Sequence, residues 1–125
     1  MPGAIIHLAA GSLMVLIGIY YSKDYFRYNH DIKEFLLLII VCLSFSLLPD
    51  FVLIIYYTTY MSSFCTALLY HNFFSFISAI VAISGLLILR YWIDIKRKPI
   101  LIMGLWCIIL HVAMDLFIEE SSIWF

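Results

Sequence analysis

Four long runs of apolar residues, separated by shorter polar stretches, dominate the pattern along this chain of 125 residues. They cover residues 4–21, 35–57, 65–89 and 100–118. Because a helix of about 20 apolar residues crosses the hydrocarbon of a bilayer, each run predicts one transmembrane helix. The first run lacks the basic segment of a signal peptide, and we expect it to be a retained span.

The polar connections between these runs predict how the spans are arranged. Residues 22–34 mix tyrosine and phenylalanine with charged side chains, a composition typical of a segment at the membrane interface. Residues 58–64 form a short, uncharged connection, and Pro99 stands at the start of the fourth run, where a helix tolerates proline. We therefore expect an all-α, polytopic membrane protein, with residues 1–125 forming a single antiparallel bundle of four transmembrane helices.

Composition strengthens this interpretation. Hydrophobic residues make up 66% of the chain and charged residues 12%, which is more apolar surface than a soluble domain of this size can bury. The formal net charge of −1 gives no indication of a nucleic-acid partner. Cys42, Cys65 and Cys107 are far apart in the sequence, so we interpret them as small apolar fillers.

The basic residues predict the orientation of the chain. All of them fall in the first and third connections: Lys23, Arg27, Lys33, Arg90, Lys96, Arg97 and Lys98. The positive-inside rule then places both termini on the extracytoplasmic side of the cell membrane. Aromatic residues stand near the predicted span ends, as in an interfacial belt: Tyr20, Tyr21, Tyr56, Tyr57, Tyr91, Trp92 and Trp124.

Ionisable side chains are rare within the spans, and five of them share a predicted depth. They are His7, Asp50, His71, His111 and Asp115. With a rise of about 1.5 Å per residue and alternating helix directions, all five fall toward the outer side of the bilayer. Each also shares a helix face with small residues, the kind of face that packs against other helices in membranes. Both properties predict that the five converge inside the bundle, with Asn72 and Ser75 nearby.

The chemistry of these groups predicts a metal site. Intramembrane carboxylates cost about 2.5–3.5 kcal/mol each and usually pair, bind an ion or face water. Pro49 should kink the second span just before Asp50 and free the carbonyl of Phe45. Three imidazoles and two carboxylates suit a divalent metal ion, zinc first, with manganese or iron as alternatives. Such an ion lowers the pKa of a water, and Asp50 or Asp115 is then expected to act as a catalytic base.

The order of the motifs resembles the membrane-bound metal-dependent hydrolase family. The chain has His7, then "LLPD", then "HNFFSF", then "HVAMD", where the family has His, Leu-Pro-Asp, His-Arg-Gly-x-Thr-His and His-x-x-x-Asp. The resemblance touches all four spans and implies the same five residues as metal ligands. Phe76 stands where the family has its second histidine, so the resemblance implies no more than one metal here.

These observations lead to a first function hypothesis and two alternatives. The first is a membrane-embedded, metal-dependent hydrolase whose substrate is a lipid or lipid-linked ester or phosphoester. The second is a non-catalytic scaffold, either a homo-oligomer or a subunit of a larger membrane complex, in which the Asp–His cluster holds the helices together. The third is proton conduction, which is disfavoured because the cytoplasmic half of every span lacks ionisable groups that would continue a path.

Overall fold

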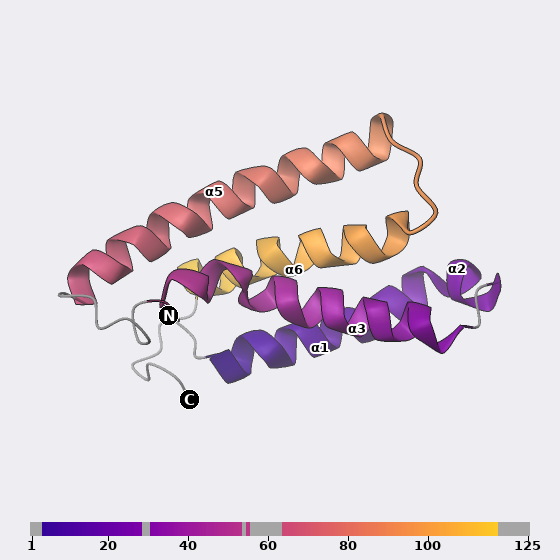
Figure 1. The fold of residues 1–125 in the computed structure, drawn as a ribbon, viewed down its shortest axis with the longest axis horizontal. Coiled ribbons are helices and arrows are strands. Elements are labelled where there is room, and N and C mark those ends of the chain that lie inside the picture. The colour runs from indigo at the N-terminus through magenta and orange to yellow at the C-terminus, as the bar shows by residue number, and fades with distance from the viewer. Residues whose placement is uncertain (1–3, 29–30, 54, 56–63, 118–125) are drawn as a thin grey trace.

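The structure of the chain is a computed structural model that describes residues 4–28, 31–53, 55 and 64–117, and all regular elements in these ranges are helical (Figure 1). The elements are α1 (Ala4–Tyr21), α2 (Lys23–Tyr28), α3 (Ile32–Leu47), the 3-10 turn η1 (Leu48–Asp50), α5 (Phe64–Tyr91) and α6 (Lys98–Phe117). Four helical stretches are long and apolar enough to cross a membrane, the second running from Ile32 through η1 to Leu53. The predicted all-α, polytopic membrane fold is therefore confirmed.

The predicted span limits agree with the helices to within about three residues where the structure describes them. The first agrees at both ends, and the third and fourth begin one and two residues earlier than expected. The expectation that residues 22–34 form only an interfacial segment is wrong at its end, because residues 32–34 belong to α3. The reason is local: the side chain of Asp31 caps this helix by accepting a hydrogen bond from the Lys33 N–H at 3.1 Å. Residues 56–63 and 118 lie outside the described ranges.

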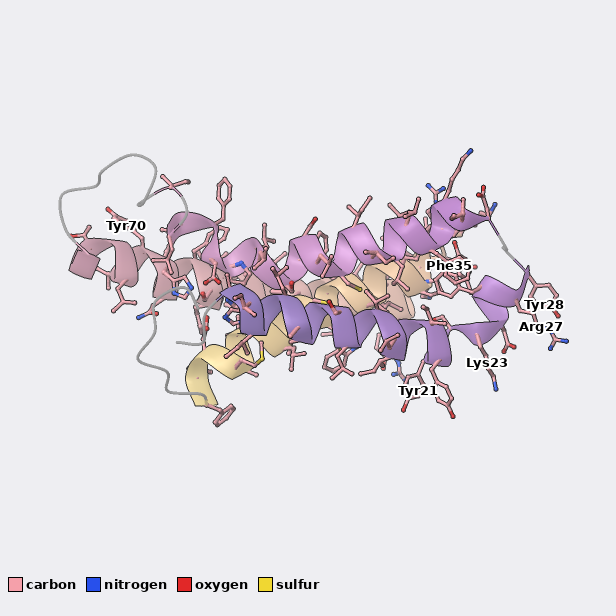
Figure 2. The ribbon with its side chains drawn as sticks, turned by 90° about the horizontal axis from the view of Figure 1, so that it is seen from below. Tyr21, Lys23, Arg27, Tyr28, Phe35 and Tyr70 are labelled. Carbon is pink, nitrogen blue, oxygen red and sulfur yellow. The ribbon has the colours of Figure 1, made fainter. Side chains whose placement is uncertain are left out.

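The four long helices run side by side along the length of the molecule (Figure 1). Helices α1 and α5 begin, and α3 and α6 finish, at one end of the bundle, while α2 and residues 92–97 lie at the opposite end. Figure 2 shows Lys23 and Arg27 at the end opposite to Tyr70. Helix α6 contacts α1, α3 and α5, and α5 also contacts η1. This arrangement gathers four different segments around one end of α6.

Small residues allow the helices to approach closely, as the sequence predicts. A Cβ atom added to Gly104 of α6 would lie 2.5 Å from Cγ1 of Val41 and 2.7 Å from Cδ2 of Phe45, both on α3. A Cβ atom added to Gly11 of α1 would lie 2.7 Å from Oγ of Ser46. Such contacts are closer than real side chains allow, so glycine is required for this packing. Cys42 and Cys107 are free, buried thiols in the same core, in agreement with their predicted role as fillers.

The outer surface of the bundle is apolar, with aromatic residues near the span ends. Large apolar side chains such as Leu16 and Val81 are more than half exposed, which is expected where lipid covers the surface. Tyr20, Tyr21, Tyr91 and Trp92 are all at least 69% exposed, in agreement with the predicted aromatic belt. Tyr56, Tyr57 and Trp124 lie outside the described residues.

A charged cluster that the sequence did not predict joins α2, α3 and the connection before α6. The guanidinium of Arg97 donates hydrogen bonds to Glu34, with Nη2 at 2.9 Å from Oε1, and the hydroxyl of Tyr25 donates to Oε2 at 2.7 Å. Hydrogen bonding to Glu34 raises the pKa of Arg97, and burial, reinforced by the Glu34 carboxylate, raises the pKa of Tyr25. The cluster thus links three segments at the basic end of the bundle through an arginine that stays charged.

Candidate metal centre

The structure brings the five predicted site residues together at the end of the bundle opposite to α2. His7 comes from α1, Asp50 from η1, His71 from α5, and both His111 and Asp115 from α6. Each lies within three residues of an end of its described apolar span, or about 5 Å along the helix axis, except His111, one turn deeper. The predicted common depth is therefore confirmed.

The break at Pro49 positions one of the histidines. Helix α3 ends at Leu47, directly before the 3-10 turn that contains Pro49, and the last four carbonyls of a helix lack a partner in that helix. The Nδ1–H of His111 donates a hydrogen bond to one of them, the carbonyl of Ser46. A carbonyl can only accept, so Nδ1 carries a proton, and Nε2 of His111 is the nitrogen that faces the two carboxylates. The sequence pointed to Phe45 rather than to Ser46 as the source of this carbonyl.

The Nε2 atoms of all three histidines face the carboxylate oxygens. His7 Nε2 lies 3.2 Å from Oδ1 of Asp115, and His111 Nε2 lies 3.1 Å from Oδ2 of the same residue. His111 Nε2 is also 3.4 Å from Oδ1 of Asp50, and His7 Nε2 is 3.9 Å from its Oδ2. His71 Nε2 lies 3.0 Å from Asp50 Oδ1 and 3.6 Å from Asp115 Oδ2. With metal–ligand bonds of about 2.1 Å, neighbouring ligands of one ion are about 3.0–3.4 Å apart, which most of these separations approach.

Most of these atoms are close without being hydrogen-bonded to one another. Among the described residues, Nε2 of His7, Nε2 of His111 and both carboxylate oxygens of Asp115 are buried and have no hydrogen-bond partner. Buried polar atoms are normally satisfied by protein groups, by water or by an ion. A cation between these atoms would satisfy all of them together, so the donor set fits a metal ion.

Four of the five residues form the compact set. His7, Asp50, His111 and Asp115 each offer one ligand atom, and these atoms all lie within 4.8 Å of one another, so this group could hold a metal ion. His71 is outside that set and is hydrogen-bonded to Asp50, since its Nε2 lies 3.0 Å from Oδ1. A carboxylate accepts this bond, so Nε2 of His71 carries the proton, whereas a histidine that binds a metal offers a lone pair. The structure thus separates His71 from the other two histidines.

The charge of the site also fits a divalent ion. The side chains of His7 and His111 are completely buried, and those of Asp50 and Asp115 are 9% and 10% exposed. The rings of His7 and His111 are stacked, with centroids 3.6 Å apart and planes inclined by 13°. If both rings were protonated to neutralise the carboxylates, two positive charges would face each other in a buried site. A divalent ion neutralises both carboxylates and leaves the rings neutral.

The neighbours expected from the sequence have mixed outcomes. Ser75 is buried, and its Oγ lies 3.5 Å from Nε2 of His71, in agreement with a supporting role. Asn72 is exposed and lines a cavity, described below, that His71 and Asp115 also line. Ser46 contributes through its carbonyl, while its hydroxyl donates to the carbonyl of Leu43. Backbone acceptors leave no signature in a sequence, and Pro49 indicated the carbonyl of Phe45 instead of this one.

Comparison with known proteins adds no relative from which residue roles could be transferred. No family model, no curated protein and no solved structure matches this chain. The resemblance to the membrane-bound metal-dependent hydrolases stays a prediction from the four sequence motifs. What is established is a multi-pass, all-α membrane bundle with a buried group of histidines and aspartates that could hold a metal ion.

Proposed function

We propose that this protein is a membrane-embedded, metal-dependent hydrolase. The observation that supports this most is the convergence of buried, unpaired Nε2 and carboxylate atoms from separate helices at the spacing of metal ligands. The resemblance of the four motifs to the membrane-bound metal-dependent hydrolases points the same way. Phe76, exposed on α5, takes the place of a second-motif histidine, so we assign one ion rather than two.

His7, His111, Asp50 and Asp115 would hold the ion. A zinc ion bound there would supply Lewis-acid chemistry, polarising an ester or phosphoester oxygen and lowering the pKa of a water; manganese or iron would serve similarly. The Ser46 carbonyl keeps His111 in the tautomer that presents Nε2 to the site. This is the usual way in which a neighbour fixes a ligating histidine.

We assign proton transfer to the pair formed by Asp50 and His71. Asp50 accepts the Nε2–H of His71 and so orients the ring, which leaves a lone pair on Nδ1. That Nδ1 atom is buried and has no hydrogen-bond partner among the described residues. In the proposed reaction this atom would take a proton from a water and return it to a leaving group. In this assignment Asp50 acts through His71 rather than as the base itself, which refines the expectation from the sequence.

The proposed location is the cell membrane, with both termini on the extracytoplasmic side. The basic residues Lys23 and Arg27 lie at the end of the bundle opposite to the site (Figure 2), and basic ends generally stay in the cytoplasm. The site then faces the outer leaflet. Labelling of single cysteines with a membrane-impermeant maleimide, in a variant lacking the native cysteines, tests this orientation.

The competing function is that of a non-catalytic scaffold, as a homo-oligomer or within a larger membrane complex. It is favoured by the same contacts, because histidine–aspartate pairs join α1, η1, α5 and α6 without any metal. The two functions differ in what His71 does. A scaffold loses folding or assembly when this residue is replaced, whereas the enzyme keeps its fold and its metal.

Metal content and hydrolysis together test the proposal. Elemental mass spectrometry of the purified protein should find about one zinc, manganese or iron ion per chain. The protein should also hydrolyse bis(p-nitrophenyl) phosphate or a phospholipid. The variant His71→Gln should retain the metal but lose about 10²–10⁴ in kcat. Arg97→Gln, at the other end of the bundle, is the matched control and should keep both. Wild-type protein that binds none of these metals after incubation and dialysis would rule out the proposed enzyme.

A further inference from the structure

The site has an open side, formed by a cavity of about 480 Å³ between α5 and α6. Of the five site residues, only His71 and Asp115 line this cavity. His7, Asp50 and His111 do not line it. A molecule in the cavity would therefore meet the proposed proton-transfer residue and one ligand of the ion first.

The lining of the cavity changes from polar to apolar. Its inner part contains His71, Ser75 and Asp115, of which Ser75 and His71 are buried. Its outer part contains Phe76, Val112 and Leu116, of which Phe76 and Leu116 are 64% and 74% exposed, and it also includes the exposed, polar side chain of Asn72. Exposed apolar side chains on a membrane span face lipid, so the mouth of the cavity opens sideways into the bilayer.

The depth of the cavity matches one part of a lipid molecule. Both His71 and Asp115 lie about one helical turn inside the ends of their apolar spans. The ends of such spans lie at the edge of the hydrocarbon, so both residues are within about 5 Å of the headgroup zone, which is about 5–8 Å deep on each side. The ester and phosphoester groups of membrane lipids occupy that boundary. A lipid could thus present its phosphoester to the site without leaving the membrane.

We infer, resting on the proposed function, that the substrate is a lipid with an acyl chain and a phosphoester group. It enters sideways between α5 and α6. Its polar group lies against His71 and Asp115, and its chain lies along Phe76, Val112 and Leu116. Pockets of this volume commonly combine apolar walls with a few polar groups that fix the orientation of the ligand. The change from polar to apolar lining corresponds to the two halves of such a lipid.

Hydrolysis at this position balances without another reactant. The oxygen of a water forms a bond to phosphorus while the bond from phosphorus to the oxygen of the lipid alcohol breaks. One proton of that water passes to Nδ1 of His71 and then to the alcohol oxygen as it leaves. The products are an alcohol and a phosphate carrying one ester bond fewer, and no oxidation or reduction takes place.

Photocrosslinking of a lipid tests this inference. The full chain is placed in nanodiscs of phosphatidylcholine and phosphatidylglycerol that contain a trace of phosphatidylglycerol with a diazirine in its acyl chain. We expect crosslinks to concentrate on residues 73–76 and 112–116. Filling the cavity with Val112→Trp should lower this crosslinking and phospholipid hydrolysis about tenfold, which corresponds to about 1.4 kcal/mol, without loss of metal.

Two further variants keep the result interpretable. Val81→Trp is the matched control, since Val81 is 59% exposed on α5 and does not line this cavity, and it should change neither quantity. Phe76→Ala widens the mouth and should raise crosslinking, which supplies a test if Val112→Trp does not fold. Crosslinks that are spread evenly over the apolar surface and insensitive to both variants overturn the inference, even if hydrolysis is observed. Concentrated crosslinks without metal or hydrolysis overturn the proposed function but support lipid binding in the cavity.

Discussion

The two ends of the bundle each bury carboxylates, but they neutralise them differently. At the basic end, Glu34 accepts hydrogen bonds from Arg97 and Tyr25, and the Arg97 side chain reaches it from a half-exposed position, 60% exposed. At the opposite end, Asp50 and Asp115 are surrounded by three buried histidines, and none of the ion pairs described there contains lysine or arginine.

This difference indicates which end is structural and which is suited to chemistry. Arginine carries its charge at every accessible pH, so the pair with Glu34 is complete within the chain itself. The aspartates have partners that are charged only when protonated, and both carboxylate oxygens of Asp115 are buried without a hydrogen-bond partner among the described residues. The second end therefore lacks a partner of fixed charge, and the divalent ion of the proposed function would supply one. The following experiments test this contrast, beginning with removal of the metal and ending with the variant for which the smallest effect is expected.

Removing the metal from the proposed site should destabilise the protein. Saturation with a ligand at about 100 times its dissociation constant stabilises a fold by about 2.7 kcal/mol. We therefore expect a chelator to lower the free energy of unfolding by about this amount, measured by denaturation of the protein in mild detergent. Asp115→Asn should abolish the difference between chelated and zinc-loaded samples, and Glu34→Gln should preserve it. Equal stability of the wild-type protein with zinc and with chelator would contradict the proposed difference between the two ends of the bundle.

Charge removal should have opposite effects at the two ends when no metal is bound. In chelated protein, Asp115→Asn takes away one of two neighbouring carboxylates and should leave stability unchanged or raise it by about 1 kcal/mol. Glu34→Gln deprives Arg97 of its partner and should lower the thermal midpoint under the same conditions. Both are read from thermal unfolding with chelator present. A loss of stability in both variants would favour the scaffold function, in which the histidine–aspartate pairs hold the helices.

A larger residue at the α3–α6 contact should destabilise the protein more than one at the α5–α6 contact. Gly104→Ala places a methyl group against Val41 and the ring of Phe45, and such overpacking typically costs about 1–3 kcal/mol. It should also weaken metal affinity, because the α3–α6 contact carries the His111 hydrogen bond to Ser46. Gly85→Ala is the matched control, since its new methyl would meet only the end of the Leu105 side chain, at 3.0 Å. Metal titration and unfolding of both variants give the comparison; equal effects would argue against this packing.

The smallest effect is expected at the basic end. Arg97→Gln removes an ion pair whose arginine is largely exposed, and such pairs contribute little. We expect the thermal midpoint to fall by no more than a few degrees and metal content to stay unchanged. Loss of metal in this variant would show that the two ends are coupled, which is contrary to the present interpretation.

The sequence predicted the spans well because hydrophobic length is a local property. The first span agreed at both ends, and the second began earlier than expected because Asp31 caps α3. The faces were also predictable: His7, Gly11 and Gly18 were placed on one face by the helical repeat, and all three are buried. The pairing of Glu34 with Arg97 was missed because the two are 63 residues apart and only the folded bundle brings them together.

The sequence by itself determined that four apolar helices cross a membrane and that five ionisable groups share one depth, because span length and axial rise depend only on local chain geometry. Only the tertiary structure decided which atoms face one another. It separated His71, bonded to Asp50, from the compact set of four, and it gave His111 a carbonyl partner on α3. These distinctions depend on the rotation and spacing of helices packed side by side, which no single segment specifies.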